Sequence, residues 1–476
     1  MERITEYFES HRREMLDRLA ALCAVPSVEG KPEEGKPFGA EVARALSLAE
    51  QMFREEGFPT EWGEGGHFVL ASYGEGERTV GIFAHADVVP AGEGWTATEA
   101  FAPIERDGFL VARGVHDNKA GIVGALYLLK AVRELAIPLD ARLLVFIGGN
   151  EESGMADVAA FLATHPAPTV SFVPDNNPPL SLGEKGIVRG WLVSPPLLSE
   201  VLDFQGGQAY NVVLDRAAAT LRYSEGLRAS LAALTAGRED VTLTEDPEGG
   251  RLLLEGYGRA AHASNPAGSR NAAAVLANVL TSSDALSADE RGVLATASMF
   301  LADPYGGTLG IAGEDGPFGR RTAVSGMVRV RNGRLFLSED IRYGSATSWE
   351  RLSADLYDTV DGEEWEFLLE EAKDGFDLGD EDPLAEALLA TYRRVTGLAD
   401  AAPYRSGGGT YARCLPRAFS VGLVVPGCSP SPASLFGKGH GDPHTPDEAL
   451  GIAAYLRALC VLTEYVITAC EFLKNE

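Results

Sequence analysis

The sequence predicts an α/β fold, with a mixed, mostly parallel sheet that carries helices on both faces and with an inserted α+β domain. Two observations lead to this prediction. Short apolar runs alternate with helical stretches in the first part of the chain, whereas residues 187–378 show strand-and-turn patterns. We therefore expect residues 1–186 and 379–476 to form one domain and residues 187–378 to form the insertion.

The elements of the first domain follow from hydrophobic periodicity and from short β-branched runs bounded by turn residues. We predict helices at 2–22, 38–57 and 119–135, and strands at 79–84, 142–147 and 169–173. This βαβ rhythm favours parallel pairing, and in such sheets reactive side chains gather at the carboxyl ends of the strands. The tail from about residue 379 returns to helix and strand and should complete the domain.

The insertion has a different pattern of residues from the first domain. The runs LLLEGYGRAAHAS and VSGMVRVRNGRLFLSEDIRYG predict antiparallel strands joined by turns. Alanine-rich stretches at 216–236 and 271–283 predict helices between them. Two similar halves would suit this layout, although no clean internal repeat is visible.

Composition and charge limit the function. The 476 residues include 45% hydrophobic and 23% charged residues, as in an ordinary globular protein. The 41 Lys and Arg residues against 69 Asp and Glu residues give a formal net charge of −28. Nucleic acid and anionic membrane surfaces are therefore poor partners.

Cysteine use and two segments of the chain indicate a cytoplasmic protein. The five cysteines are scattered without metal-binding spacing, which is typical of reduced thiols. The segment MERITEYFESHRREML lacks the apolar core of a signal peptide. The apolar run LGIAAYLRALCVLTEYVITAC carries Arg457 and Glu464, so we expect a packed amphipathic helix and not a membrane span.

Polar side chains gather where the predicted strands end. Four successive junctions carry them: His85 and Asp87 in HADVVP, Asp117 in GVHDNKAG, Glu151 and Glu152 in GGNEESG, and Asp175 in VPDNN. Any one of them alone could be a helix cap or a turn residue. Four in order are hard to explain as caps, and adjacent carboxylates at the tip of a buried strand are costly unless positive charge meets them. One histidine with several carboxylates is a ligand set suited to Zn²⁺ or Mn²⁺.

These motifs, followed in order by GRAAHASNP and PHTPDE, resemble those of the di-zinc metallopeptidases related to aminoacylase and acetylornithine deacetylase. The segments GGQAYN, YGGTLGIA, DIRYG and GGTYAR are similar to those of the PepV-type dipeptidases within this family. The resemblance spans nearly the whole chain and implies a di-zinc exopeptidase-like catalytic domain with an inserted lid domain. One departure is Asn118, where the dipeptidases usually have a second Asp that is not itself a ligand.

The resemblance implies two divalent metal ions, with Zn²⁺ as the first choice and Mn²⁺ or Co²⁺ as alternatives. Asp117 is implied to bridge the two ions, and its peptide bond to Asn118 is implied to be cis. The other implied ligands are Glu152 and His444 for one ion and His85 and Asp175 for the second. Glu151 would stay unligated as the general base, and Asp87 resembles the carboxylate that orients a ligand imidazole.

Further residues are implied to contact the substrate. By resemblance, His262 would stabilise the oxyanion, Arg342 would clamp a C-terminal carboxylate, and Asn211 and Gly409 would lie near the substrate. Taken alone, His262 could be a packed or solvent-facing histidine and Arg342 an ordinary surface arginine. The glycines at 407–409 could simply turn the chain.

The implied activity is metal-dependent hydrolysis of the peptide bond in dipeptides or short peptides with free ends. Deacylation of N-acyl amino acids is the alternative, because it uses the same kind of site, and a metal-binding homologue without activity is a third. Deacylases of this family usually have a shorter lid that dimerises. The long insertion at 187–378 therefore favours a dipeptidase, and a monomer over a dimer.

Two histidines in GKGHGDPHTPDE compete for the last ligand role. The neighbouring glycines and Pro443 disfavour a helix that would place His440 and His444 on one face. We predict instead that the next helix starts near 446–448, with Thr445 as its N-cap. In this interpretation His444 is the ligand, and His440 lies on a glycine-rich segment.

Overall fold

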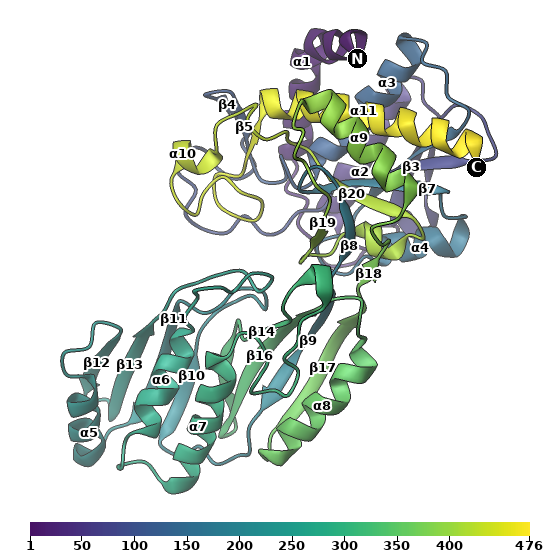
Figure 1. Cartoon of the computed structure of the whole chain (residues 1–476). Coiled ribbons are helices and arrows are strands. Elements are labelled where there is room, and N and C mark those ends of the chain that lie inside the picture. Colours follow the sequence, from purple (N-terminus) through teal and green to yellow (C-terminus); the bar gives the residue numbers. More distant parts are fainter. The chain divides into compact units, whose positions relative to one another are not determined.

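The computed structural model describes residues 1–476, and the chain divides into two units (Figure 1). The first unit comprises Met1–Gly183, Leu378–Tyr404 and Thr410–Glu476. The second comprises Glu184–Asp377 and the short segment Arg405–Gly409. The two ends of the chain therefore share one unit, although the second unit separates them in the sequence.

The first unit is built on a central sheet with the strand order β1 (Thr60–Trp62), β2 (Phe68–Tyr73), β6 (Arg142–Gly148), β3 (Thr79–His85), β7 (Val170–Asn176), β20 (Ala418–Gly422) and β8 (Ser181–Glu184). The four middle strands, from β6 to β20, pair in parallel. The strands β1, β2 and β8 pair antiparallel with their neighbours. Four carboxyl ends therefore lie at one edge of the sheet, where ligands bind in open α/β sheets.

The remaining elements of the first unit are helices and a small second sheet. The helices are α1 (Glu2–Cys23), α2 (Ala40–Glu55), α3 (Lys119–Glu134), α4 (Ala156–Thr164), α9 (Pro383–Thr396), α10 (Pro432–Phe436) and α11 (Ile452–Asn475), with single turns η1 (Glu64–Gly66) and η3 (Tyr411–Cys414). The small sheet has the order β21 (Ala449–Gly451), β5 (Phe109–Val111) and β4 (Ile104–Arg106). The short strand β19 (Tyr404–Ser406) pairs with β8, and its residues Arg405 and Ser406 belong to the second unit.

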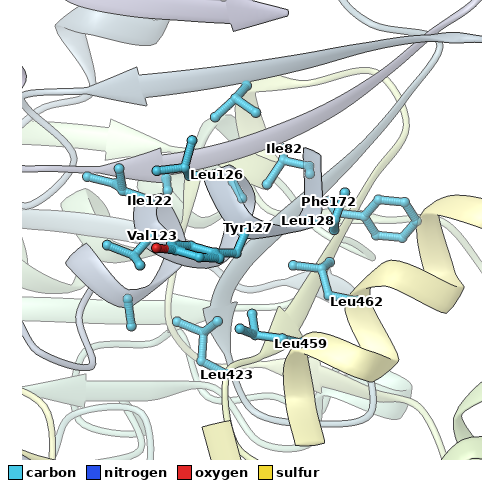
Figure 2. Close-up of a cluster of buried hydrophobic side chains, with 14 of the residues drawn as sticks. Ile82, Ile122, Val123, Leu126, Tyr127, Leu128, Phe172, Leu423, Leu459 and Leu462 are labelled. Carbon is cyan, nitrogen blue, oxygen red and sulfur yellow. The ribbon is translucent and has the colours of Figure 1, made fainter. Parts of the chain in front are cut away.

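Helices cover both faces of the central sheet because its strands are apolar on both sides. Val145 and Ile147 of β6 belong to a core shared with α1, α2, α3 and α11. Phe146, which lies between them in the sequence, packs against Phe161 of α4 on the opposite face. Figure 2 shows part of the core that β6 shares with α1, α2, α3 and α11, with Ile82 of β3 among leucines of α3 and α11. The predicted fold class is confirmed.

The helix α11 is long and apolar enough to cross a membrane by length and composition, but 78% of its most apolar window is buried. It packs against α1 and α9. The packed helix expected from the last apolar run is therefore confirmed.

The second unit contains two antiparallel sheets. The first has the order β10 (Val201–Gln205), β11 (Arg216–Arg222), β13 (Arg251–Tyr257) and β12 (Val241–Asp246). The second has the order β14 (Thr322–Val324), β16 (Arg334–Tyr343), β9 (Gly186–Val193) and β17 (Glu366–Lys373), with β15 (Val328–Arg331) also paired to β16. The other elements are α5 (Glu225–Thr235), α6 (Ala272–Thr281), α7 (Ala288–Ala302), α8 (Trp349–Gly362), η2 (Gly316–Phe318) and β18 (Phe376–Asp377). Apolar residues of both sheets share one core.

One helix prediction in this unit is wrong for residues 216–222, which form β11. Alanine favours helices, but Ala217, Ala219 and Leu221 are buried while the residues between them are more exposed. This alternation has the period of a strand, and pairing with both β10 and β13 satisfies the backbone. The helix expected there begins only at Glu225, after its N-cap Ser224.

A second prediction is wrong near the C-terminus, because α11 begins at Ile452 and not near 446–448. Thr445 caps no helix; its hydroxyl donates to the carbonyl of Asp442. The carboxylates of Asp447 and Glu448 accept hydrogen bonds from distant loops, so long-range contacts override the local capping pattern. The other predicted helices and strands are present, with small shifts at their ends.

Candidate metal centre

The five predicted metal ligands lie together in the first unit. Three stand on or directly after the parallel strands, and two come from loops that approach the same edge of the sheet: His85 ends β3, Asp175 lies in β7, Glu152 follows β6, Asp117 precedes α3 and His444 precedes β21. They form two groups that could each hold an ion. His85, Asp117 and Asp175 make one group, and Asp117, Glu152 and His444 make the other.

Asp117 belongs to both groups because its two carboxylate oxygens face different histidines. Its Oδ1 lies 3.0 Å from His85 Nε2, and its Oδ2 lies 3.0 Å from His444 Nε2. The remaining ligand atoms lie close by, with Asp175 Oδ2 at 3.4 Å from His85 Nε2 and Glu152 Oε2 at 3.1 Å from His444 Nε2. This is the geometry of a carboxylate shared between two ion positions.

The residues present fit a pair of divalent cations. Ligand atoms around a tetrahedral Zn²⁺ at about 2.0–2.1 Å stand roughly 3.3 Å apart, which is close to the separations found here. Two carboxylate oxygens at the site are buried without a hydrogen-bond partner: Glu151 Oε1 and Glu152 Oε1. Buried polar atoms are almost always satisfied, so these atoms are suited to a ligand.

The pKa shifts of the buried carboxylates also favour positive charge at the site. Burial, together with neighbouring carboxylates, raises the pKa of Glu151 well above its usual value, and burial with Asp117 nearby raises that of Glu152 to about 7. Burial likewise raises the pKa of Asp175 to about 6. Although burial opposes it, hydrogen bonds from His444 and His85 lower the pKa of Asp117 well below its usual value. Cations among these carboxylates would favour the ionised form of each of them.

Glu151 is set apart from its neighbour. It belongs to neither ligand group, although it lies next to Glu152 in the loop after β6. Its backbone N–H donates to Asp87 Oδ1 at 3.2 Å, and that of Glu152 donates to Asp87 Oδ2 at 3.1 Å. One carboxylate thus fixes the backbone of both glutamates.

Asp87 has a further contact with the histidine of β3. The Nδ1 atom of His85 lies 3.0 Å from the Asp87 carbonyl oxygen and 3.4 Å from its Oδ1. Nδ1 is therefore held by Asp87, which leaves Nε2 directed at the carboxylates. The sequence resemblance implied this contact with the imidazole but not the hold on the glutamate loop.

Glu448 is a structural residue of the site that the sequence prediction missed. Its buried carboxylate pairs with Arg113 Nη1 at 2.7 Å and accepts backbone N–H groups from Gly114, His116 and Asp117. The loop that carries Asp117 is therefore tied to the segment that carries His444. The sequence offered Glu448 only as a helix-start residue.

Asp157 performs the same task for the glutamate loop. Its Oδ2 accepts the N–H groups of Gly149 and Asn150 at 2.7 and 2.8 Å and the Tyr411 hydroxyl at 2.5 Å. A side chain on Gly148 would clash with both partners, since its Cβ would lie 1.9 Å from the Tyr411 hydroxyl and 2.2 Å from Asp157 Oδ2. This explains the first glycine of GGNEESG.

The Asp117–Asn118 peptide bond is cis, as expected. The Asn118 side chain donates to Asp175 Oδ1 at 3.0 Å and to the Pro174 carbonyl at 2.5 Å. Asn118 therefore contacts a predicted ligand without belonging to either ligand group.

In the second unit, His262 and Asn211 lie together. Asn211 Nδ2 is 3.3 Å from His262 Nε2, and His262 Nδ1 accepts the backbone N–H of Ser264 at 3.2 Å. The Asn211 amide donates to a neutral Nε2, with Nδ1 lying 2.7 Å from Ser264 Oγ, whereas a protonated imidazole can donate from Nε2 to a substrate oxygen.

Arg342 is buried, contrary to the reading as a surface arginine. Its guanidinium pairs with Asp340 through Nε and Nη2 and donates from Nη1 to the Gly407 carbonyl at 2.9 Å. These bonds leave one N–H on each of its two terminal nitrogens. Gly409 lies two residues beyond Gly407, in a half-buried position.

His444 and His440, the two candidates for the last ligand role, have different partners in the structure. His444 Nε2 faces Asp117 and Glu152, whereas His440 Nδ1 lies 2.7 Å from Asp447 Oδ2 and in neither ligand group. Asp447 also accepts from the backbone of Thr96 and Ala97.

Comparison with known proteins agrees with this geometry. Residues 81–468 match the model of the peptidase family M20/M25/M40. The chain belongs to this family. Among curated relatives of this peptidase is "Putative dipeptidase YtjP" of Bacillus subtilis (strain 168), which is 32% identical over 410 residues, covering 83% of this chain and 85% of the relative.

Solved structures show the same fold. Human carnosine dipeptidase 1 aligns with a TM-score of 0.57 at 15% identity over 99% of both chains. The dipeptidase Dug1p of Saccharomyces cerevisiae aligns with a TM-score of 0.59 at 13% identity, over 99% of this chain and 98% of its own. At these sequence identities, the similarity shows only that the fold is shared.

The first prediction separates the two adjacent glutamates. Glu151→Gln should keep the metal content of the purified protein while turnover falls by roughly 10²–10⁴-fold, because a general base is lost. Glu152→Ala should lose metal, because a ligand is lost. Metal analysis by mass spectrometry with steady-state kinetics checks both, and the reverse pattern would show that the pair is assigned backwards.

A second prediction concerns the histidines. His444→Ala should lose one ion and all activity, whereas His440→Ala, its matched control, should keep both ions and change KM at most. The measurement is the metal-to-protein ratio of each variant. Loss of an ion from the His440 variant alone would contradict the assignment.

The third prediction tests the tie between the loops. Glu448→Ala leaves Arg113 buried without its partner, so the free energy of unfolding should fall by about 3–5 kcal/mol. Its metal affinity should fall as well, because Asp117 is no longer held. Asp17→Ala, which breaks an exposed pair with Arg13, should cost at most about 1 kcal/mol in denaturant unfolding. Equal losses in the two variants would rule out this role for Glu448.

Proposed function

We propose that this chain is a dipeptidase that hydrolyses the peptide bond of dipeptides and short peptides with free ends, with two Zn²⁺ ions per chain. The observation that carries the proposal is Asp117, whose two oxygens serve two ligand groups beside the unligated Glu151. The ligand set of histidine and carboxylate suits Zn²⁺. The name of the relative from Bacillus subtilis supports the choice of substrate.

The proposed chemistry divides between the cations and the side chains. When bound, two divalent cations polarise the scissile carbonyl and lower the pKa of a water molecule towards about 7. Glu151 takes a proton from the attacking water and later gives it to the leaving amine. Its position fits this task, because its Oε1 is buried at the site without a protein partner.

Residues around this base keep it in place. Asp87 holds the backbone of Glu151 and Glu152, so the base and the ligand beside it move together. Asp87 also fixes the His85 ring through Nδ1. Adjacent residues can take different roles because one binds a cation and its neighbour does not.

The residues of the second unit are assigned to the substrate. His262 donates from Nε2 to the oxyanion, with Asn211 beside it. Arg342 binds the substrate's C-terminal carboxylate with the N–H groups that Asp340 and Gly407 leave, and Gly409 gives the substrate room near the backbone.

The test compares substrates that differ only in their blocked ends. Unblocked dipeptides should be hydrolysed, and N-acetyl amino acids should not be. Amidation of the dipeptide's C-terminus should raise KM strongly in the wild type but have little added effect in Arg342→Ala. Because that variant leaves Asp340 buried without its main partner, Arg342→Met combined with Asp340→Asn serves as the folding control. Preferential cleavage of N-acetyl amino acids would instead favour a deacylase.

A further inference from the structure

A cavity of about 430 Å³ lies within the first unit, directly beside the candidate metal centre. Asp117 and Asp175, which belong to the same ligand group as His85, line it. Its volume falls within the range of sites that bind small molecules. Neither the sequence motifs nor the assigned roles above account for this space.

The largest wall of the cavity is apolar and preformed. It comes from the segment after β20, where Leu423, Val424 and Val425 are followed by prolines at 426, 430 and 432. Leu423 and Val425 are buried in the main core, so this wall is anchored to the unit. Buried Phe109 and Ala449 also line the cavity. Such a wall is suited to an apolar group of appreciable size.

The charge of the cavity sets which part of a substrate it accepts. Neither lysine nor arginine lines it, and Asp442 adds a carboxylate that belongs to neither ligand group. A residue that carries the substrate's free carboxylate would find no cation among the lining side chains. A residue that carries an α-ammonium group meets the carboxylate of Asp442.

We propose that this cavity is the subsite for the amino-terminal residue of the substrate and that it selects a large apolar side chain, such as leucine or phenylalanine, at that position. The apolar side chain lies against the wall from 423 to 432, and the α-ammonium group faces Asp442. This proposal rests on the proposed dipeptidase function.

Steady-state kinetics on matched dipeptides test the selection. The kcat/KM of Leu-Ala and Phe-Ala should exceed that of Gly-Ala by about tenfold or more, since filling an apolar pocket gives discrimination of this size. The series Ala-Gly, Ala-Leu and Ala-Phe should vary less. A preference that follows the second residue instead would overturn the proposal.

Variants of the wall locate the effect. Val424→Trp fills the cavity, so the kcat/KM of Phe-Ala should fall at least tenfold more than that of Gly-Ala. The control is Leu398→Trp, an exposed residue of the same unit outside the cavity, which should change neither value. Asp442→Asn should raise the KM of Leu-Ala several-fold, more at low than at high salt. Equal losses on all substrates with Val424→Trp would exclude the cavity.

A binding measurement separates this proposal from the proposed function. Calorimetry on metal-loaded Glu151→Gln should find that L-leucine binds more tightly than glycine and more tightly than N-acetyl-L-leucine. If dipeptides are hydrolysed but leucine has no advantage, the subsite proposal fails and the function stands. If leucine is preferred but no dipeptide is hydrolysed, the proposed function fails, and the cavity is a site for apolar amino acids but not a subsite for peptide hydrolysis.

Discussion

The first unit depends on one electrostatic constraint, which is the crowding of carboxylates in a buried site. Glu151, Glu152, Asp117 and Asp175 meet where water is largely excluded, and burial together with their mutual repulsion raises the pKa of three of them. Only Asp117 has its pKa lowered, because both histidines donate to it. Positive charge between these groups offsets the repulsion between the carboxylates. Crowding that is unfavourable without cations therefore makes a strong site for a pair of divalent cations.

A charged site of this kind requires a rigid backbone, and further buried carboxylates supply it. Asp87 and Asp157 each accept two backbone N–H groups of the loop after β6, and Glu448 accepts three from the loop before α3. The bonds of Asp87 and Glu448 join segments that lie far apart in the sequence, whereas those of Asp157 close the loop from the following helix. The ligands are therefore positioned by hydrogen bonds to the main chain, which hold more precisely than side-chain packing alone.

The same edge of the sheet combines this polar site with an apolar wall. The wall from 423 to 432 follows β20, the parallel strand next to β7, which carries Asp175. The cavity that it lines touches two of the predicted ligands. The candidate metal centre and the apolar wall lie next to each other because parallel strands direct all their carboxyl ends to one edge of the sheet.

The sequence by itself predicted the fold class from local strand and helix patterns, and its resemblance to a known family predicted the residues that meet in the two ligand groups. The tertiary structure alone decided the rest. Residues 216–222 form a strand because they pair with two neighbouring strands. Glu448 lies in a sequence pattern typical of a helix start, but its carboxylate binds a distant loop. Arg342 was buried by its pair with Asp340. In each case the deciding partner lies far along the chain or is set by the fold, so no local pattern could reveal it.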